Sequence, residues 1–213
     1  MAEDGSWLSI EKEGLLSTSA LLTLYRISGS KRNDIEEKWR PCKVTISCNG
    51  LQDAVIRDQK VMPPEDLEIC LTGGMTPQDW YRLINGKVFL WANRQRLEWF
   101  LSANEYKNSP HIVVEVDTRD LLERHADRVT LTNFNSGSTL YSRPYTKPRS
   151  RGRRSFVSVA EYPGYAADGI VEVAVEKSIP EISEIAISAE RWIARETGYR
   201  KVEYERLAQI WHR

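Results

Sequence analysis

The clearest strand signal in the chain is the run His-Ile-Val-Val-Glu-Val at residues 111–116. Asp117 and Thr118 follow, and such residues are typical of helix N-caps, so they predict a short helix over residues 120–125. A second apolar run, residues 169–175, predicts another strand. Short strands that alternate with short helices, without a P-loop or a Rossmann glycine motif, are typical of an α+β protein.

Composition supports a globular protein of moderate size. The chain has 213 residues, of which 41% are hydrophobic, and 30 basic residues balance 30 acidic ones. This length predicts one compact domain over residues 1–190. Residues 191–213, rich in Arg and Glu, predict a helical tail. The balanced charge excludes a polycation that binds nucleic acid or membranes nonspecifically.

No apolar run approaches the roughly 20 residues that a membrane-spanning helix needs. The three cysteines, Cys42, Cys48 and Cys70, form no CxxC pair, and the three histidines are far apart. We therefore expect a soluble cytoplasmic protein with no membrane contact, no disulfide framework and no metal site.

Glu172 lies between two valines in the strand predicted over residues 170–175. Because side chains alternate along a strand, Glu172 points away from the face that Val171 and Val173 share. If the valines face the core, Glu172 is merely an exposed strand residue. If the strand is central, the carboxylate is covered, where a charge persists only when it is paired or used for chemistry.

Three further segments carry polar or aromatic groups beside apolar runs. Arg57 follows residues 54–56, where its guanidinium could bind a phosphate or pair with Asp58. Trp91 ends the run 88–91 and could stack on a base or nicotinamide, or belong to the core. The segment 133–139 could hold a phosphate or ribose, or form a plain turn, and its candidate side chains are those of Asn135, Ser136, Ser138 and Thr139.

Residues 143–154 contain six basic residues and no acidic one. Tyr141, Tyr145 and Phe156 lie in or near this stretch, and arginines interleaved with aromatics are typical of single-strand nucleic-acid grooves. The stretch predicts a nucleic-acid-binding loop, and the alternative is a solvated loop that binds nothing. The arginines assigned to binding are Arg149, Arg151, Arg153 and Arg154.

Four segments together resemble an uncharacterised bacterial family, known only as a domain of unknown function. They are residues 7–22, 54–59, 85–91 and 135–139, and the resemblance extends over about residues 1–187. This family implies no activity.

A weaker resemblance is to DNA-targeting ADP-ribosyltransferase toxins of the DarT type. These toxins carry a helix with a Gly-Leu turn, an Arg after a strand, and a Glu in an apolar strand before an Ile-Pro step. Residues 10–16, Arg57, and residues 171–175 followed by Ile179-Pro180 match these features. The chain departs from the toxins at Met1, which stands where their first strand ends, and it lacks the His of that strand.

The resemblance to these toxins implies a split mixed or antiparallel sheet of the ADP-ribosyltransferase type, with Arg57 and Glu172 as catalytic residues in one cleft. NAD would be the co-substrate, Arg57 would grip its pyrophosphate, and Trp91 and the segment 133–139 would bind the rest. DNA or RNA is the expected acceptor, in a bacterial toxin or phage-defence effector that could have an antitoxin partner. The alternative is a non-catalytic module that binds nucleotides or nucleic acid.

Overall fold

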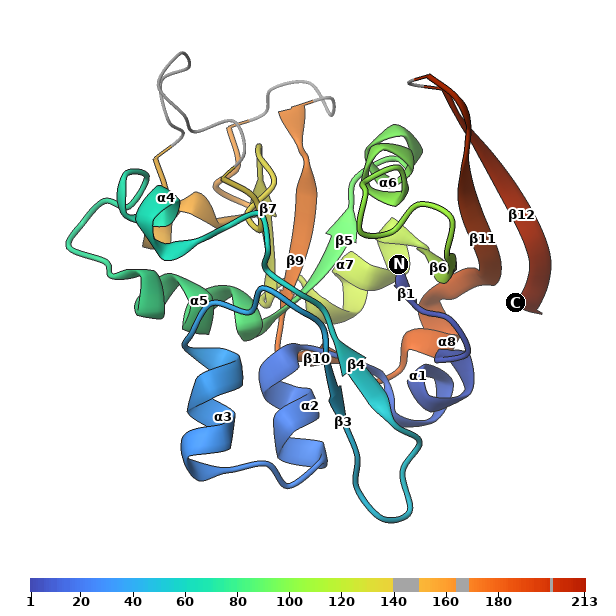
Figure 1. The fold of residues 1–213 in the computed structure, drawn as a ribbon, viewed down its shortest axis with the longest axis horizontal. Helices are drawn as coiled ribbons and strands as arrows, with labels where there is room; N and C mark the ends of the chain where they lie inside the picture. Colours follow the sequence, from blue (N-terminus) through green and yellow to red (C-terminus); the bar gives the residue numbers. More distant parts are fainter. Residues whose placement is uncertain (140–149, 164–168, 200) are drawn as a thin grey trace. The chain divides into compact units, whose positions relative to one another are not determined.

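The computed structural model describes residues 1–139, 150–163, 169–199 and 201–213 (Figure 1). Helices and several antiparallel sheets are interspersed along the chain, which confirms the α+β class. The chain divides into two compact units. Unit 1 comprises Met1–Leu15, Leu90–Asp127 and Ile179–Arg213, and unit 2 comprises Leu16–Phe89 and Arg128–Ser178.

Unit 1 is built on a four-stranded sheet in the order β1-β6-β11-β12. Its strands are β1 (Ala2–Glu3), β6 (Pro110–Val116), β11 (Ala186–Gly198) and β12 (Lys201–His212). Its helices are α1 (Trp7–Glu13), α6 (Arg94–Leu101), α7 (Thr118–His125) and α8 (Ile182–Ile185). The predictions of a strand over 111–116 and of a helix capped by Asp117 are confirmed, since Oδ1 of Asp117 accepts hydrogen bonds from the amides of Arg119 and Asp120.

Helix α1 ends at Gly14, and this glycine is required there for two reasons. Its φ is +85°, a conformation that residues with a side chain rarely adopt. A Cβ atom at this position would also lie 2.7 Å from Cα of Pro180. The end of α1 thus packs directly on the backbone that leads into α8.

The expectation of a helical tail over residues 191–213 is wrong. These residues form most of the β11–β12 hairpin, drawn in red in Figure 1, with pairs from Ser188 opposite His212 to Gly198 opposite Lys201. The local helix preference of Ala, Arg and Glu amounts to only tenths of a kcal/mol per residue. Strand β11 is paired on both edges, with β6 and with β12, and it buries Trp192 and Ile193. Long-range pairing therefore outweighs local propensity.

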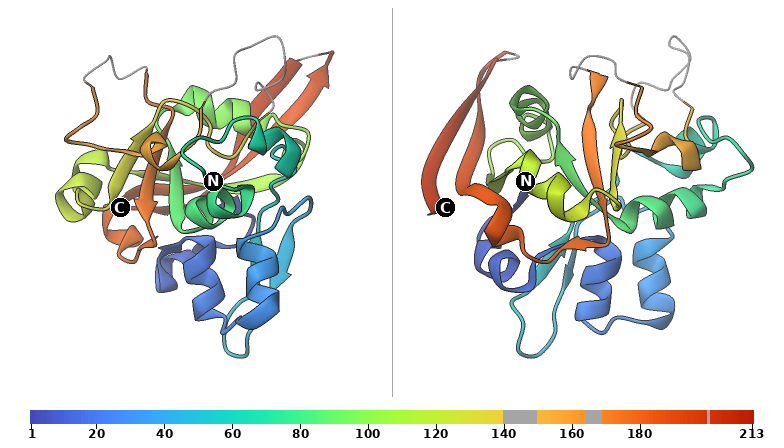
Figure 2. Two further views of the ribbon diagram at one scale, coloured as in Figure 1. Left: turned by 90° about the vertical axis from the view of Figure 1, so that its left-hand side faces the viewer. Right: turned by 180° about the vertical axis from the view of Figure 1, so that it is seen from behind.

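Unit 2 contains a sheet in the order β5-β9-β7-β8 and a separate hairpin. The sheet strands are β5 (Lys87–Trp91), β9 (Glu172–Glu176), β7 (Val129–Thr132) and β8 (Val157–Ser158), and the hairpin strands are β3 (Val44–Ile46) and β4 (Ala54–Ile56). The helices are α2 (Thr18–Leu24), α3 (Gly29–Glu36), α4 (Pro64–Glu68), α5 (Pro77–Asn85) and the 3-10 turn η1 (Arg153–Ser155). Figure 2 shows α2 and α3 side by side in both views. Two short strands, β2 (Leu15–Leu16) and β10 (Ser178–Ile179), lie at the sequence boundaries of the units.

Helix α5 anchors the core of unit 2. Thr76 and Asp79 form a capping box at its start, with Pro77 in the first turn. Its inner face buries Trp80 and Tyr81. Among the described residues, no helix has the length and apolar composition that crossing a membrane requires.

Candidate functional site

Glu172 is the first residue of β9, which lies between β5 and β7 in the sheet of unit 2. Its partner in the register is Thr132, the last residue of β7. Because the strand is internal and its surroundings are packed, the residue is only 4% exposed. The interpretation of Glu172 as an exposed strand residue is therefore wrong, and the carboxylate is covered.

Two groups donate hydrogen bonds to Oε2 of Glu172. The backbone N–H of Ser136 lies 3.1 Å away and the hydroxyl of Thr132 lies 3.3 Å away. The same hydroxyl lies 2.7 Å from the carbonyl oxygen of Phe134. A threonine hydroxyl carries one proton, so it can donate to the carboxylate or to the carbonyl, but not fully to both. This arrangement can accommodate both the ionised and the protonated form of Glu172.

Burial raises the pKa of Glu172 from the ordinary 4.5 to about 7. The hydrogen bonds from Ser136 and Thr132 and the positive charge of Arg151 act in the opposite direction, but burial dominates. Near neutral pH the carboxyl group can therefore both release and accept a proton. Such a pKa is what general acid–base chemistry requires.

The segment 133–139, here called the 133–139 loop, is a tightly packed turn. Oδ1 of Asn135 accepts a hydrogen bond from Gly137 N at 3.0 Å, as expected for a turn stabilised by its own Asn. Ser136 and Thr139 are buried, and both N and Oγ1 of Thr139 bond to the carbonyl of Val61. The backbone of Ser136 and both polar groups of Thr139 thus hold the loop in place, and a cofactor site lined by their side chains stays a prediction.

Arg151 is also buried, with 3% exposure, although it comes from the stretch predicted to be an exposed loop. Its Nη2 donates to the carbonyl of Ser138, and its guanidinium carbon lies 5.1 Å from the ring centroid of Phe134. The assignment of Arg151 to nucleic-acid docking is therefore corrected, because its guanidinium faces the protein interior. Arg153 and Arg154 are exposed, and Arg149 lies outside the described residues.

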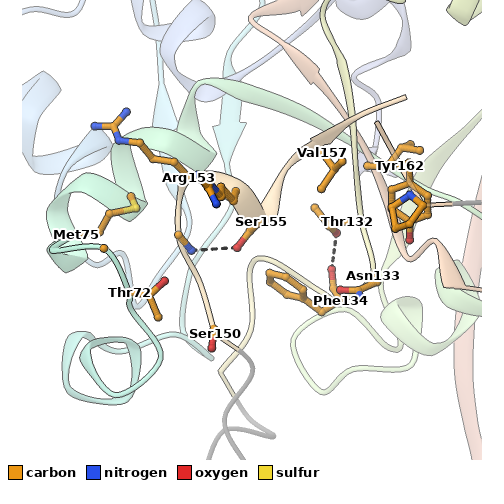
Figure 3. A pocket seen from close by; sticks show the side chains of 15 residues that line it. Thr72, Met75, Thr132, Asn133, Phe134, Ser150, Arg153, Ser155, Val157 and Tyr162 are labelled. Atoms are coloured by element: carbon orange, nitrogen blue, oxygen red, sulfur yellow. Dashed lines mark hydrogen bonds between the residues drawn. The ribbon is translucent and has the colours of Figure 1, made fainter. Parts of the chain in front are cut away.

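A pocket of about 580 Å³ opens beside the glutamate. Thr132 and Phe134 line one side of it, and Arg153 lies across from them (Figure 3). The wall also includes Thr72, Met75, Asn133, Arg154 and Tyr162. Thr132 both lines the pocket and bonds to Glu172, whereas Glu172 is not among the residues that line it.

Two other predicted residues are not among those that line this pocket. Arg57 follows β4, its carbonyl accepts a hydrogen bond from Nε of Arg40 at 3.1 Å, and it does not contribute to the described pocket lining. Trp91 belongs to unit 1, where its ring packs on Phe100 with centroids 5.2 Å apart, as expected for a core aromatic. The described contacts bring Glu172 together with Ser136 and Arg151.

Thr72, Thr132 and Tyr162 were missed by sequence reasoning. Thr132 could have been suspected, since it ends an apolar strand just before the 133–139 loop. Thr72 and Tyr162 stand in irregular segments with no pattern that distinguishes them from other surface residues.

Comparison with curated proteins and with solved structures found no match for this chain. A model of a protein family does match, over residues 1–186, and its description is "Family of unknown function (DUF7002)". Because the match includes most of the 213 residues, the chain belongs to this family, as the resemblance over residues 1–187 predicted.

Proposed function

We propose that the chain is an NAD-dependent ADP-ribosyltransferase with Glu172 as its catalytic carboxylate. The observation that supports this most is the buried Glu172, with a pKa of about 7, whose hydrogen-bond partner Thr132 lines an open pocket. Buried carboxyl groups with shifted pKa values are concentrated at functional sites. The proposal includes the finer assignment of the fold to the ADP-ribosyltransferase type.

The reaction needs a carboxylate near the ribose. The glycosidic bond between ribose C1′ and the nicotinamide nitrogen breaks, and nicotinamide leaves with the bonding electron pair. A nucleophilic atom of the acceptor forms the new bond to C1′ and gives up its proton. Ionised Glu172 stabilises the positive charge that develops on the ribose, and it can accept the acceptor's proton.

The rim of the pocket has groups suited to the rest of NAD. Arg153 and Arg154 are exposed and line the pocket. One guanidinium group can donate two parallel hydrogen bonds to the oxygens of a phosphate. Tyr162 offers aromatic surface to a base or to nicotinamide. In this proposal Arg153 and Arg154 take the pyrophosphate role that the sequence assigned to Arg57.

The acceptor in this proposal is a nucleic acid, and the biological setting is a toxin or phage-defence effector of the cytoplasm, with an antitoxin as a further proposed partner. Arg149 and the basic residues before it in the stretch 143–154 supply the positive charge for docking. Modification of the polymer should then weaken steeply with salt.

The test is incubation of the purified protein with NAD labelled in its adenylate group and a mixture of DNA, RNA and protein. We expect released nicotinamide and label retained on nucleic acid. Glu172→Gln should reduce both by at least about tenfold and up to about a thousandfold. The control Glu68→Gln alters an exposed carboxylate of α4 and should leave both rates unchanged.

Absence of both nicotinamide release and label transfer from the wild type would refute the proposal. Binding of NAD without either reaction would favour the second candidate, a nucleotide-binding module without catalysis. The observation behind this candidate is that Glu172 is nearly inaccessible and meets the pocket through Thr132.

A further inference from the structure

Arg151 joins the rim of the pocket to the loop that holds Glu172. Its backbone N–H donates to the carbonyl of Cys70 at 2.7 Å, and its carbonyl accepts from N and Oγ1 of Thr72, at 2.9 and 3.1 Å. Its side chain donates a hydrogen bond to the carbonyl of Ser138 in the 133–139 loop. One residue thus ties the segment after α4 to the 133–139 loop.

Gly152, the residue after Arg151, allows the backbone to pass close to the side chain of Thr72 at the edge of the pocket. A Cβ atom on Gly152 would lie 2.8 Å from Oγ1 of Thr72, so a glycine is needed where the chain passes this side chain. Gly152, Arg153 and Thr72 all line the pocket. Thr72 thus contacts both Arg151 and Gly152 while it lines the pocket.

The guanidinium of Arg151 also acts on Glu172 electrostatically. Among the described residues, the groups that influence this carboxylate are the hydroxyl of Thr132 on β7, the N–H and hydroxyl of Ser136 in the loop, and the charge of Arg151. A buried guanidinium is costly unless an opposite charge or hydrogen bonds compensate for it. The nearby carboxylate, the carbonyl of Ser138 and the face of Phe134 provide this compensation.

We propose that Arg151 is a positioning residue, which fixes the 133–139 loop so that the Ser136 amide holds Glu172 and which places its positive charge where it acts on this carboxylate. Its importance for catalysis rests on the proposed function, in which Glu172 stabilises the transition state. The geometric and electrostatic parts can be tested without NAD.

The first measurement is the protonation midpoint of Glu172 by carbon-13 NMR of labelled glutamate carboxyl groups. The signal of Glu172 is identified by its absence in Glu172→Gln. Arg151→Met removes the positive charge and should raise the midpoint, because an opposite charge nearby favours the ionised carboxylate. Arg151→Lys keeps the charge and should leave the midpoint within about half a unit of the wild type.

The second measurement is hydrogen exchange of the Ser136 amide. Lysine lacks the planar fork that reaches the Ser138 carbonyl while covering Phe134, so both Arg151 variants should exchange this amide at least about tenfold faster. Arg119→Met, at an exposed position of α7, is the matched control and should change neither measurement.

A midpoint that is unchanged or lowered in folded Arg151→Met would overturn the inference. If that variant does not fold, unchanged Ser136 exchange in Arg151→Lys would overturn it equally. Absence of nicotinamide release from the wild type would contradict the proposed function alone, because neither measurement here involves NAD.

Discussion

Replacing Glu172 with Gln should remove a pH-dependent part of the free energy of unfolding. Burial raises the pKa of Glu172 in the folded protein to about 7, against an ordinary 4.5. The folded state therefore binds the proton more tightly, so the stability that this group contributes is complete below pH 4.5 and is lost as the pH rises to 7. About 2.5 pKa units at about 1.4 kcal/mol each amount to roughly 3 kcal/mol.

The assay is urea unfolding followed by tryptophan fluorescence at pH 4.5 and pH 8. The wild type should lose about 3 kcal/mol more than Glu172→Gln between these values, because every other titrating group is common to both proteins. Glu68→Gln, which removes an exposed carboxylate, should behave as the wild type does. Equal pH dependence in the wild type and Glu172→Gln would refute the assignment of a raised pKa to this carboxyl group.

Three further predictions follow from individual contacts. Thr132→Val removes the hydroxyl that lies 3.3 Å from Glu172 Oε2, so the NMR midpoint of Glu172 should rise, and an unchanged midpoint would contradict the hydrogen bond. Gly14→Ala places a Cβ atom 2.7 Å from Cα of Pro180 at a positive φ, so the free energy of unfolding should fall by at least about 2 kcal/mol. An unaltered melting temperature would contradict this prediction. Arg153→Met removes a cation from the pocket rim, so ADP-ribose, titrated by calorimetry, should bind more weakly at low salt, and equal affinity would remove the arginine from the binding site.

Elements with strong local signals were predictable from the sequence. Strand β6 has a run of β-branched residues, and α5 begins with the Thr76 and Pro77 pattern that caps a helix. In both cases the local preference and the long-range packing favour the same structure. The α+β class followed from such elements.

The tail and the site depended on partners far away in the sequence. The alternation around Glu172 showed that it opposes Val171 and Val173, but only the burial of Glu172 in the folded chain, at 4% exposure, shows that its own face is covered. The basic composition of residues 143–154 likewise gave no sign that Arg151 turns inward to the carbonyl of Ser138. Composition reports how much charge a segment has and not where each side chain lies.

The sheet of unit 1 also has a consequence for how the protein is made. Strand β6 is complete at Val116, but its neighbour β11 begins only at Ala186, about 70 residues later. The ribosome adds about 5–20 residues per second, so several seconds pass between the synthesis of β6 and that of β11. During this time only the two-residue strand β1 is available to pair with β6. A nascent chain that stalls in this interval exposes the open edge of β6 to strands of neighbouring polypeptides.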